Sequence, residues 1–226
     1  MTATLTRPLP ADLLYGRLLA TAAQEVLDGT PAPPAKLRLA DGSLETLPLD
    51  RWLGPVDAAD AEVLELAKGP VIDLGCGPGR HAAELRAAGT AALGVDFSPV
   101  AISIARRRGA AVMLGDLFTG VPHAGRWRTA LLLDGNVGIG GAPEALLRRT
   151  CELLAPGGSA LVELDAPGAP TYRTCVRIEA SGVVSHWFPW ARVGVDGIEA
   201  LARGADLSAD EAFSAGGRWF ARLLAP

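Results

Sequence analysis

The sequence predicts an α/β protein built on a doubly wound, mostly parallel sheet. From residue 70 onward, short apolar segments alternate with segments of helical character. These apolar segments are apolar throughout, as expected of parallel strands that helices cover on both faces. Successive strands are about 20–30 residues apart, which is the length of a strand–helix–strand crossover unit.

The segments before residue 70 predict a small extension of different character. Residues 12–28 place leucine and alanine at helical spacing, which predicts an amphipathic helix. Residues 36–49 contain two alternating apolar runs around an Asp-Gly pair, which is a hairpin signal. A further helix is expected after Asp57, a suitable N-cap. We therefore predict an N-terminal helix and hairpin extension over residues 1–56 and a main domain over residues 57–226.

The elements of the main domain follow in a regular order. Five strands are predicted in "PVIDLG", "AALGVD", "AAVMLGD", "TALLLD" and "SALVELD". The helices between them are expected near residues 79–88, 98–108 and 143–154. The last third departs from this rhythm, with an inserted hairpin over about residues 171–193 and a helix over 196–207. Two final strands are expected on either side of Gly216-Gly217.

Charge and cysteine content limit the functional classes. The formal net charge is −4, which argues against a dedicated nucleic-acid binder. The three cysteines have no C-x-x-C spacing, so neither a disulfide framework nor a zinc site is expected. We find no signal-peptide pattern and no apolar run of about 18 residues. We therefore expect a soluble, cytoplasmic protein with no membrane partner.

The stretch "VIDLGCGPGR" predicts a ligand-binding turn at the end of the first strand of the sheet. Gly75, Gly77 and Gly79 allow positive φ and close approach of a ligand to the backbone. A dinucleotide fingerprint would need glycine where Arg80 stands, and the Lys-Ser/Thr ending of a phosphate loop is absent. Asp73 repels phosphate and attracts a cation. The turn therefore favours a nucleoside-like ligand that carries a positive group.

Two further acids end the next strands. Asp96 follows Asp73 by 23 residues, and an acid at this place can accept both hydroxyls of a ribose. Asp116 ends the third strand and could accept a hydrogen bond from an exocyclic amine. Because the carboxyl ends of parallel strands share one edge of the sheet, all three acids are expected at the same site.

Together these segments resemble the class I S-adenosylmethionine-dependent methyltransferases. The matching segments, over about residues 57–165, are "VIDLGCGPGR", "ALGVDFSPVAISIAR", "AVMLGDL", "TALLLDGN" and "LLAPGGSALVEL". The resemblance implies a Rossmann-like, seven-stranded sheet to which an antiparallel C-terminal hairpin, about residues 208–214 and 217–224, is added. It also implies S-adenosyl-L-methionine as cofactor and transfer of its methyl group by in-line displacement.

The resemblance also implies roles for individual residues. Asp73 would face the ammonium group of the cofactor, Asp96 the ribose and Asp116 the adenine amine. Asp134 would lie by the methionine part and the methyl group. The expected cofactor-binding residues are Asp73, Gly75, Cys76, Gly77, Gly79, Asp96, Phe97, Asp116, Leu117 and Asp134. No metal site is expected, because His81, His123 and His186 are scattered along the chain.

The residues that contact the methyl acceptor are harder to predict. Asn136, in a glycine-rich loop, offers a donor and an acceptor, although the loop could equally be a long turn. The inserted hairpin could form a wall of the acceptor pocket through Tyr172, Trp187, Trp190 and Arg192, with His186 as a candidate general base. Its apolar residues could instead be core. Tyr15 could close over the cofactor or simply pack within its helix.

The expected acceptor is a small molecule, because the sequence contains no basic face and no appended recognition domain. A protein or RNA acceptor and a non-catalytic cofactor-binding protein are the alternatives. Transfer to a base amine is disfavoured, because "DGNVG" does not match an Asn-Pro-Pro-aromatic motif. A nicotinamide-dependent oxidoreductase is disfavoured by Arg80.

Overall fold

The structure is a computed structural model that describes residues 8–226, so residues 1–7 of the predicted extension lie outside the described part. Its central sheet has seven strands: β3 (Val71–Leu74), β4 (Ala92–Asp96), β5 (Val112–Leu114), β6 (Trp127–Leu132), β7 (Leu154–Leu164), β11 (Ser208–Ala215) and β12 (Arg218–Leu224). They lie in the order β11-β12-β7-β6-β3-β4-β5. The strands from β3 to β7 pair in parallel, and β12 is antiparallel to β7 and β11. The predicted doubly wound sheet with a C-terminal hairpin is confirmed.

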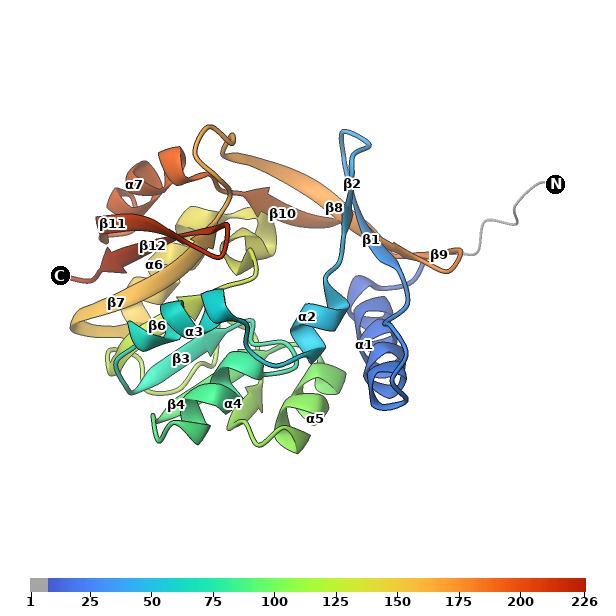
Figure 1. Cartoon of the computed structure of the whole chain (residues 1–226). Coiled ribbons are helices and arrows are strands. Elements are labelled where there is room, and N and C mark those ends of the chain that lie inside the picture. The colour runs from blue at the N-terminus through green and yellow to red at the C-terminus, as the bar shows by residue number, and fades with distance from the viewer. Residues whose placement is uncertain (1–7) are drawn as a thin grey trace.

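Helices cover both faces of this sheet (Figure 1). They are α3 (Ala58–Glu65), α4 (Arg80–Ala87), α5 (Pro99–Arg107), α6 (Pro143–Leu153) and α7 (Val195–Arg203). Successive side chains of a strand point to opposite faces, so Val71 packs with α3 and α4 while Ile72 packs with α6 and α7. Asp57 caps α3 as predicted, because its carboxylate accepts the backbone N–H of Asp60.

The N-terminal extension and the inserted hairpin form a second sheet, which the sequence did not predict. Its strands are β1 (Ala35–Leu39), β2 (Leu44–Thr46), β8 (Tyr172–Ala180), β9 (Val183–Val184) and β10 (Phe188–Arg192). The order is β10-β8-β1-β2, with β9 paired to β8, and we call this the cap sheet. The strands β1 and β8 pair antiparallel, for example Leu37 with Ile178. The division of the chain at residue 56 stays a prediction.

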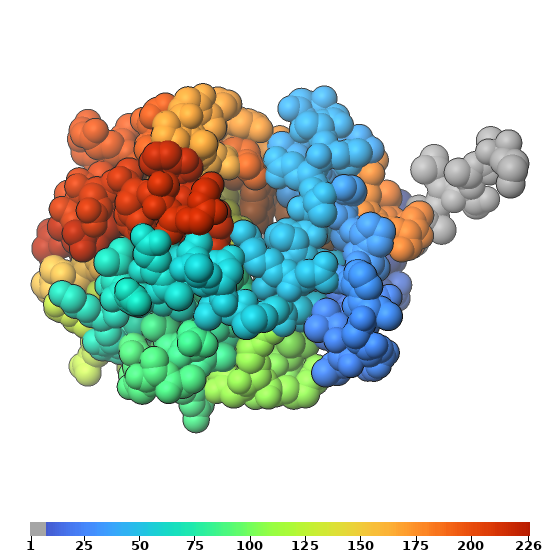
Figure 2. Space-filling view, viewed as in Figure 1, coloured from blue at the N-terminus to red at the C-terminus, as the bar shows by residue number. Residues whose placement is uncertain are grey.

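Two helices of the extension support the cap sheet, namely α1 (Ala11–Leu27) and α2 (Leu49–Leu53). Leu14 and Leu18 of α1 share an apolar cluster with Ile104 of α5 and Ile178 of β8. Figure 2 shows this blue N-terminal part against the green helices of the main domain and the orange inserted strands. The extension is therefore packed onto the strand ends that the sequence predicted to hold the ligand. The short helix α2 was missed because five residues are too few to show a helical period.

The glycine-rich segment after β6 is the 3-10 helix η1 (Asn136–Gly141). Its glycines allow β10 to lie directly against it. A Cβ at position 138 would lie 2.1 Å from the carbonyl oxygen of Ala191, and one at position 141 would lie 2.9 Å from Cβ of Pro189. The segment leads into α6 and supports the cap sheet. Asn136 also lines the cavity, so its role at the acceptor stays a prediction.

This close approach predicts that Gly138→Ala destabilises the protein. The added methyl group would meet a backbone oxygen that cannot move alone, and overpacking of this kind costs about 1–3 kcal/mol. Urea unfolding followed by circular dichroism would measure the loss. Gly115→Ala is the control, because its Cβ would make only ordinary contacts at 3.5 Å or more. Equal stability of the two variants would contradict the proposed packing.

Candidate functional site

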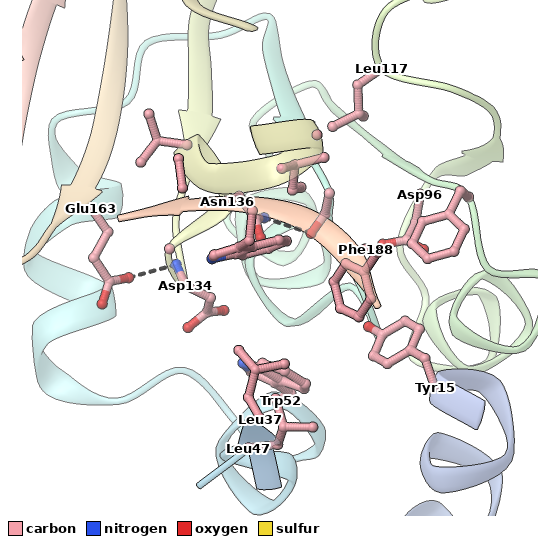
Figure 3. A pocket seen from close by; sticks show the side chains of 18 of the residues that line it. Tyr15, Leu37, Leu47, Trp52, Asp96, Leu117, Asp134, Asn136, Glu163 and Phe188 are labelled. Carbon is pink, nitrogen blue, oxygen red and sulfur yellow. Dashed lines mark hydrogen bonds between the residues drawn. The ribbon is translucent and has the colours of Figure 1, made fainter. Parts of the chain in front are cut away.

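A cavity of about 790 Å³ lies between the main domain and the cap sheet. Its floor is formed by residues that follow β3, β4, β5 and β6 and by the end of β7, where ligands bind in open α/β sheets. The opposite walls come from α1, α2 and the cap sheet. Figure 3 shows Tyr15 and Phe188 from these walls near Asp96, with Asp134 and Glu163 farther along the cavity.

The glycine turn contributes to this floor in two ways. Gly75 and Cys76 line the cavity, and Gly75 has a φ of +78°. Gly77 and Gly79 also have positive φ but are not lining residues. A Cβ at position 79 would lie 2.6 Å from Cβ of Ala105, so this glycine allows α4 and α5 to pack closely.

Asp96 lies at the end of β4 with its carboxylate at the cavity and only 4% of the residue exposed. Its two oxygens accept the backbone N–H groups of Gly77 and Ser98, at 2.9 and 2.8 Å. Burial raises the pKa of Asp96, although these hydrogen bonds oppose the effect. The bonds fix the direction of the carboxylate, which leaves its remaining lone pairs for a ligand.

An aromatic and apolar region lies next to Asp96. The ring of Phe97 is exposed and stacks on Tyr15 at a centroid distance of 6.1 Å. Asp116 and Leu117 also line the cavity, and a carboxylate oxygen of Asp116 accepts the N–H of Phe118 at 2.9 Å. The structure therefore brings these residues of the predicted cofactor site together, and Tyr15 contacts them.

Asp73 lies behind the turn and does not line the cavity. It is on the face of β3 that packs against α4, because side chains alternate along a strand. Its Oδ2 has no hydrogen-bond partner and lies 4.0 Å from Nδ1 of the buried His81. Burial raises the pKa of Asp73 to about 6, and it also lowers the pKa of His81.

Asp134 lies at the cavity after β6 and is surrounded by arginines. Both of its carboxylate oxygens accept Nη2 of Arg80 at 2.9 Å, and Oδ1 also accepts Nη2 of Arg51 at 2.6 Å. Its backbone N–H donates to Glu163 at 2.6 Å. Burial acts to raise the pKa of Asp134, but the charges of Arg80 and Arg51 outweigh it and the pKa is lowered.

A buried ion-pair network continues behind Asp134. Arg80 also pairs with Asp60, which has no exposed surface. Arg218 of β12 donates to the same Asp60 at 2.7 Å and to both carboxylate oxygens of Glu163, at 2.9 and 2.7 Å. The network therefore joins two helices to the ends of three strands and holds Asp134 in place.

The predicted acceptor residues are only partly at the cavity. Asn136 lines it, and its amide nitrogen donates to the carbonyl oxygens of Leu74 and Gly75 at 2.9 and 2.8 Å. Trp190 and Arg192 of the inserted hairpin also line it. Tyr172, His186 and Trp187 are exposed and are not lining residues, so the hairpin contributes a wall without its histidine.

Several lining residues were missed by sequence reasoning. Leu37, Leu47, Arg51 and Trp52 come from the extension, and Glu163 comes from β7. The alternation of Leu37 and Leu39 predicted a strand but could not say what its inner face covers. Within residues 8–226, no helix is long and apolar enough to cross a membrane. The described residues also contain no group of three or more His, Cys, Asp or Glu residues that could hold a metal ion.

Comparison with known proteins shows what this chain is similar to. Residues 71–158 match the family described as methyltransferase domain. A crystal structure of a SAM-dependent methyltransferase from Bacteroides fragilis, in complex with S-adenosyl-L-homocysteine, has a TM-score of 0.76. It is 21% identical, and the match covers 98% of this chain and 99% of that one. No curated protein matches the chain.

Two further structures share the fold at lower similarity. An amino pentose methyltransferase of calicheamicin biosynthesis from Micromonospora echinaspora, with SAM bound, has a TM-score of 0.57, at 17% identity over 78% of this chain and 94% of that one. A sugar N-methyltransferase from a Streptoalloteichus species has a TM-score of 0.57, at 17% identity over 74% and 87%. The doubly wound sheet and the cavity at its strand ends are those of a Rossmann-like methyltransferase fold. Residues 71–158 therefore resemble a methyltransferase domain, and the whole chain has the fold of known SAM-dependent methyltransferases.

The buried Asp73 predicts a specific dependence of stability on pH. Because its pKa is raised to about 6 in the folded protein, its contribution to stability is fully present below pH 3.8 and is lost as the pH rises through 6. Asp73→Asn removes this titration. The free energy of unfolding of the variant, relative to the unaltered protein, should therefore rise by about 3 kcal/mol between pH 4 and pH 7.

Urea unfolding at the two pH values would test this expectation. Asp41→Asn is the control, because hydrogen bonds from Ser43 lower the pKa of Asp41 and its titration therefore lies below pH 3.8. The relative stability of that variant should change little between pH 4 and pH 7. A stability difference for Asp73→Asn that does not change with pH would contradict the assignment.

Proposed function

We propose that the protein transfers the methyl group of S-adenosylmethionine to a small molecule with a free amine. The observation that supports this most strongly is that the proposed donor residues and a separate apolar wall line the same cavity. The donor occupies the part near the glycine turn, Asp96 and Asp116. The acceptor occupies the part between Asp134 and the cap sheet.

In the donor part, each group of S-adenosylmethionine has a suitable partner. Asp96 accepts the ribose hydroxyls, Phe97 and Leu117 pack on the adenine, and Asp116 accepts from its amine. Gly75 and Cys76 allow the methionine part to approach the backbone. Asp134 lies by the methyl group. Asp73 acts from behind the turn, where its charge attracts the ammonium group without touching it.

Transfer needs little chemical assistance from the protein. The bound donor supplies a methyl group on a sulfonium. The nucleophile of the acceptor forms a bond to this methyl carbon, the carbon–sulfur bond breaks, and its electron pair stays on the sulfur as a thioether. The described residues hold the acceptor in line with that bond and exclude water, which is a proximity effect. Trp52 and the cap-sheet residues form the wall that does this.

The lining residues favour an acceptor that needs no general base. The described lining contains neither histidine nor lysine, and the pKa values of Tyr15 and Cys76 are raised by burial. At the acceptor end, Asp134 and Glu163 are held by arginines. A neutral hydroxyl is a weak nucleophile, so a hydroxyl acceptor would have to lose its proton to one of these groups. An amine in its free-base form is nucleophilic without such a base.

The walls and charges also favour an amine with an apolar body. Apolar surface at the acceptor end comes from Leu37, Leu47, Trp52 and Trp190. Arg192 is already held by both oxygens of Asp165 and by Glu45, so it is not available to an anionic acceptor. Two structures of the same fold are described as amino pentose and sugar N-methyltransferases, which supports an acceptor of this kind.

The donor assignment predicts the effect of Asp96→Ala. Loss of the hydrogen bonds to the ribose should weaken binding of S-adenosylhomocysteine by about 1.5–3 kcal/mol, the range for a charged partner. Isothermal titration calorimetry measures this directly. Asp210→Ala, which removes an exposed acid that pairs with Arg222, should leave the dissociation constant unchanged. An unchanged constant for Asp96→Ala would refute the ribose assignment.

The acceptor assignment predicts a preference among matched compounds. With S-adenosylmethionine present, 2-phenylethylamine should yield more S-adenosylhomocysteine than 2-phenylethanol or 3-phenylpropanoate. The free-base amine is a stronger nucleophile than a neutral hydroxyl, and unlike the acid it carries no negative charge. Mass spectrometry of the methylated product identifies the acceptor atom. Methylation of the alcohol or the acid in preference to the amine would contradict the proposal. Activity only on a protein or RNA, or none with any acceptor, would favour the alternative functions.

A further inference from the structure

We propose that Arg51, from the N-terminal extension, binds the carboxylate of the methionine part of the donor. This inference rests on the proposed function, because it assumes that S-adenosylmethionine occupies the cavity. The donor ends in an amino acid, so a buried carboxylate must find a cation or several donors. Among the described residues that line the cavity, the cations are Arg51, Arg80 and Arg192.

Two of these arginines are already committed to the protein. Arg192 lies on β10 at the acceptor end, where Nε and Nη2 bind Asp165 and Nη1 binds Glu45. Arg80 is 4% exposed, pairs with Asp60 and donates to both oxygens of Asp134. Arg80 cannot turn to a ligand without leaving the buried Asp60 unpaired, which is strongly unfavourable. Arg192 would have to give up hydrogen bonds that already occupy all three of its nitrogens.

Arg51 is more exposed than Arg80 and has fewer partners than Arg192. Its side chain is 30% exposed, and a single nitrogen, Nη2, pairs with Asp134. Its Nε is buried and has no hydrogen-bond partner among the described residues. A guanidinium presents five N–H groups in a planar fork that fits a carboxylate. Arg51 therefore has donors that remain for a ligand while it keeps its contact with Asp134.

The position of Arg51 matches the geometry of an amino-acid group. Asp134 lies two residues before Asn136, whose amide nitrogen is 2.8 Å from the carbonyl oxygen of Gly75. Arg51 and Asp134 thus present a positive and a negative group side by side next to the glycine turn. The donor carries an ammonium and a carboxylate on one carbon atom. The two pairs of charges are complementary, with the carboxylate on Arg51 and the ammonium towards Asp134 and the turn.

This arrangement gives the extension a role in donor binding. Arg51 lies on α2, whereas the other proposed donor ligands lie on the main domain. The donor carboxylate would therefore connect the extension to the main domain across the cavity. The same helix carries Trp52, which lines the cavity. Binding of the complete donor would hold this wall in place, and a donor without a carboxylate would not.

Two ligands that differ only in the carboxylate test the proposal. S-adenosylmethionine and its decarboxylated form share the adenosine, the sulfonium and the ammonium group. Calorimetric titration of the full chain should show Arg51→Gln weakening S-adenosylmethionine about tenfold to a hundredfold, as for hydrogen bonds to a charged group. Binding of the decarboxylated form should stay the same or tighten, because Asp134 loses a competing cation. The affinity of Arg51→Lys for S-adenosylmethionine should lie between that of the unaltered protein and that of Arg51→Gln.

Controls distinguish the possible failures. Arg192→Gln removes the other half-exposed arginine of the cavity and should affect the two ligands equally. Thermal unfolding of each variant shows whether it is folded. Equal weakening of both ligands by Arg51→Gln, or no weakening of either, would overturn the role of Arg51 while leaving donor binding intact. Failure of the unaltered protein to bind either ligand would instead overturn the proposed function.

Discussion

The ion pair between Arg80 and Asp134 is the interaction on which the site depends most. Arg80 stands at the start of α4, directly after the glycine turn, and its guanidinium is almost completely buried. A buried guanidinium is tolerated only with carboxylate partners in good geometry. It takes them from Asp60 on α3 and from Asp134 after β6. The turn, the helices and the fourth parallel strand are therefore held in one arrangement, with an acid fixed at the cavity.

The second determinant of the site is the cap sheet. Residues of β1 pair with β8, more than a hundred residues later in the chain. The hairpin of the N-terminal extension and the hairpin inserted after β7 thus form a single wall over the strand ends, and the glycines of η1 let it pack against the main domain. This pairing explains how one cavity can have a polar floor from the main domain and an apolar wall from elements outside it.

The sequence predicted the local features well and the long-range ones poorly. Buried strands, the glycine turn and the cap at Asp57 depend on neighbouring residues, so the periodicity and the residue types sufficed. Asp96 was correctly expected at the cavity because it ends a strand. Asp73 was not distinguished from it, because only the alternation of side chains along β3 shows that it faces α4.

The contacts around Asp134 could not be predicted for the same reason. Arg51, Arg80 and Arg218 come from three distant segments, and no spacing in the sequence relates them. His186 was considered because of its residue type, yet it lies in the connection between β9 and β10, where it is exposed. Of the hairpin residues that the sequence singled out, Trp190 and Arg192 line the cavity and Tyr172, His186 and Trp187 do not, and their roles stay predictions.

A crystal structure with S-adenosylhomocysteine tests the central claim most directly, namely that one cavity holds donor and acceptor on either side of Asp134. In that structure the ribose hydroxyls should contact Asp96 and the sulfur should lie near Asp134. Open space should extend from the sulfur towards Leu47 and Trp190. A ligand whose adenine lies against the cap sheet would contradict this arrangement. So would a ligand whose sulfur faces away from the cap sheet.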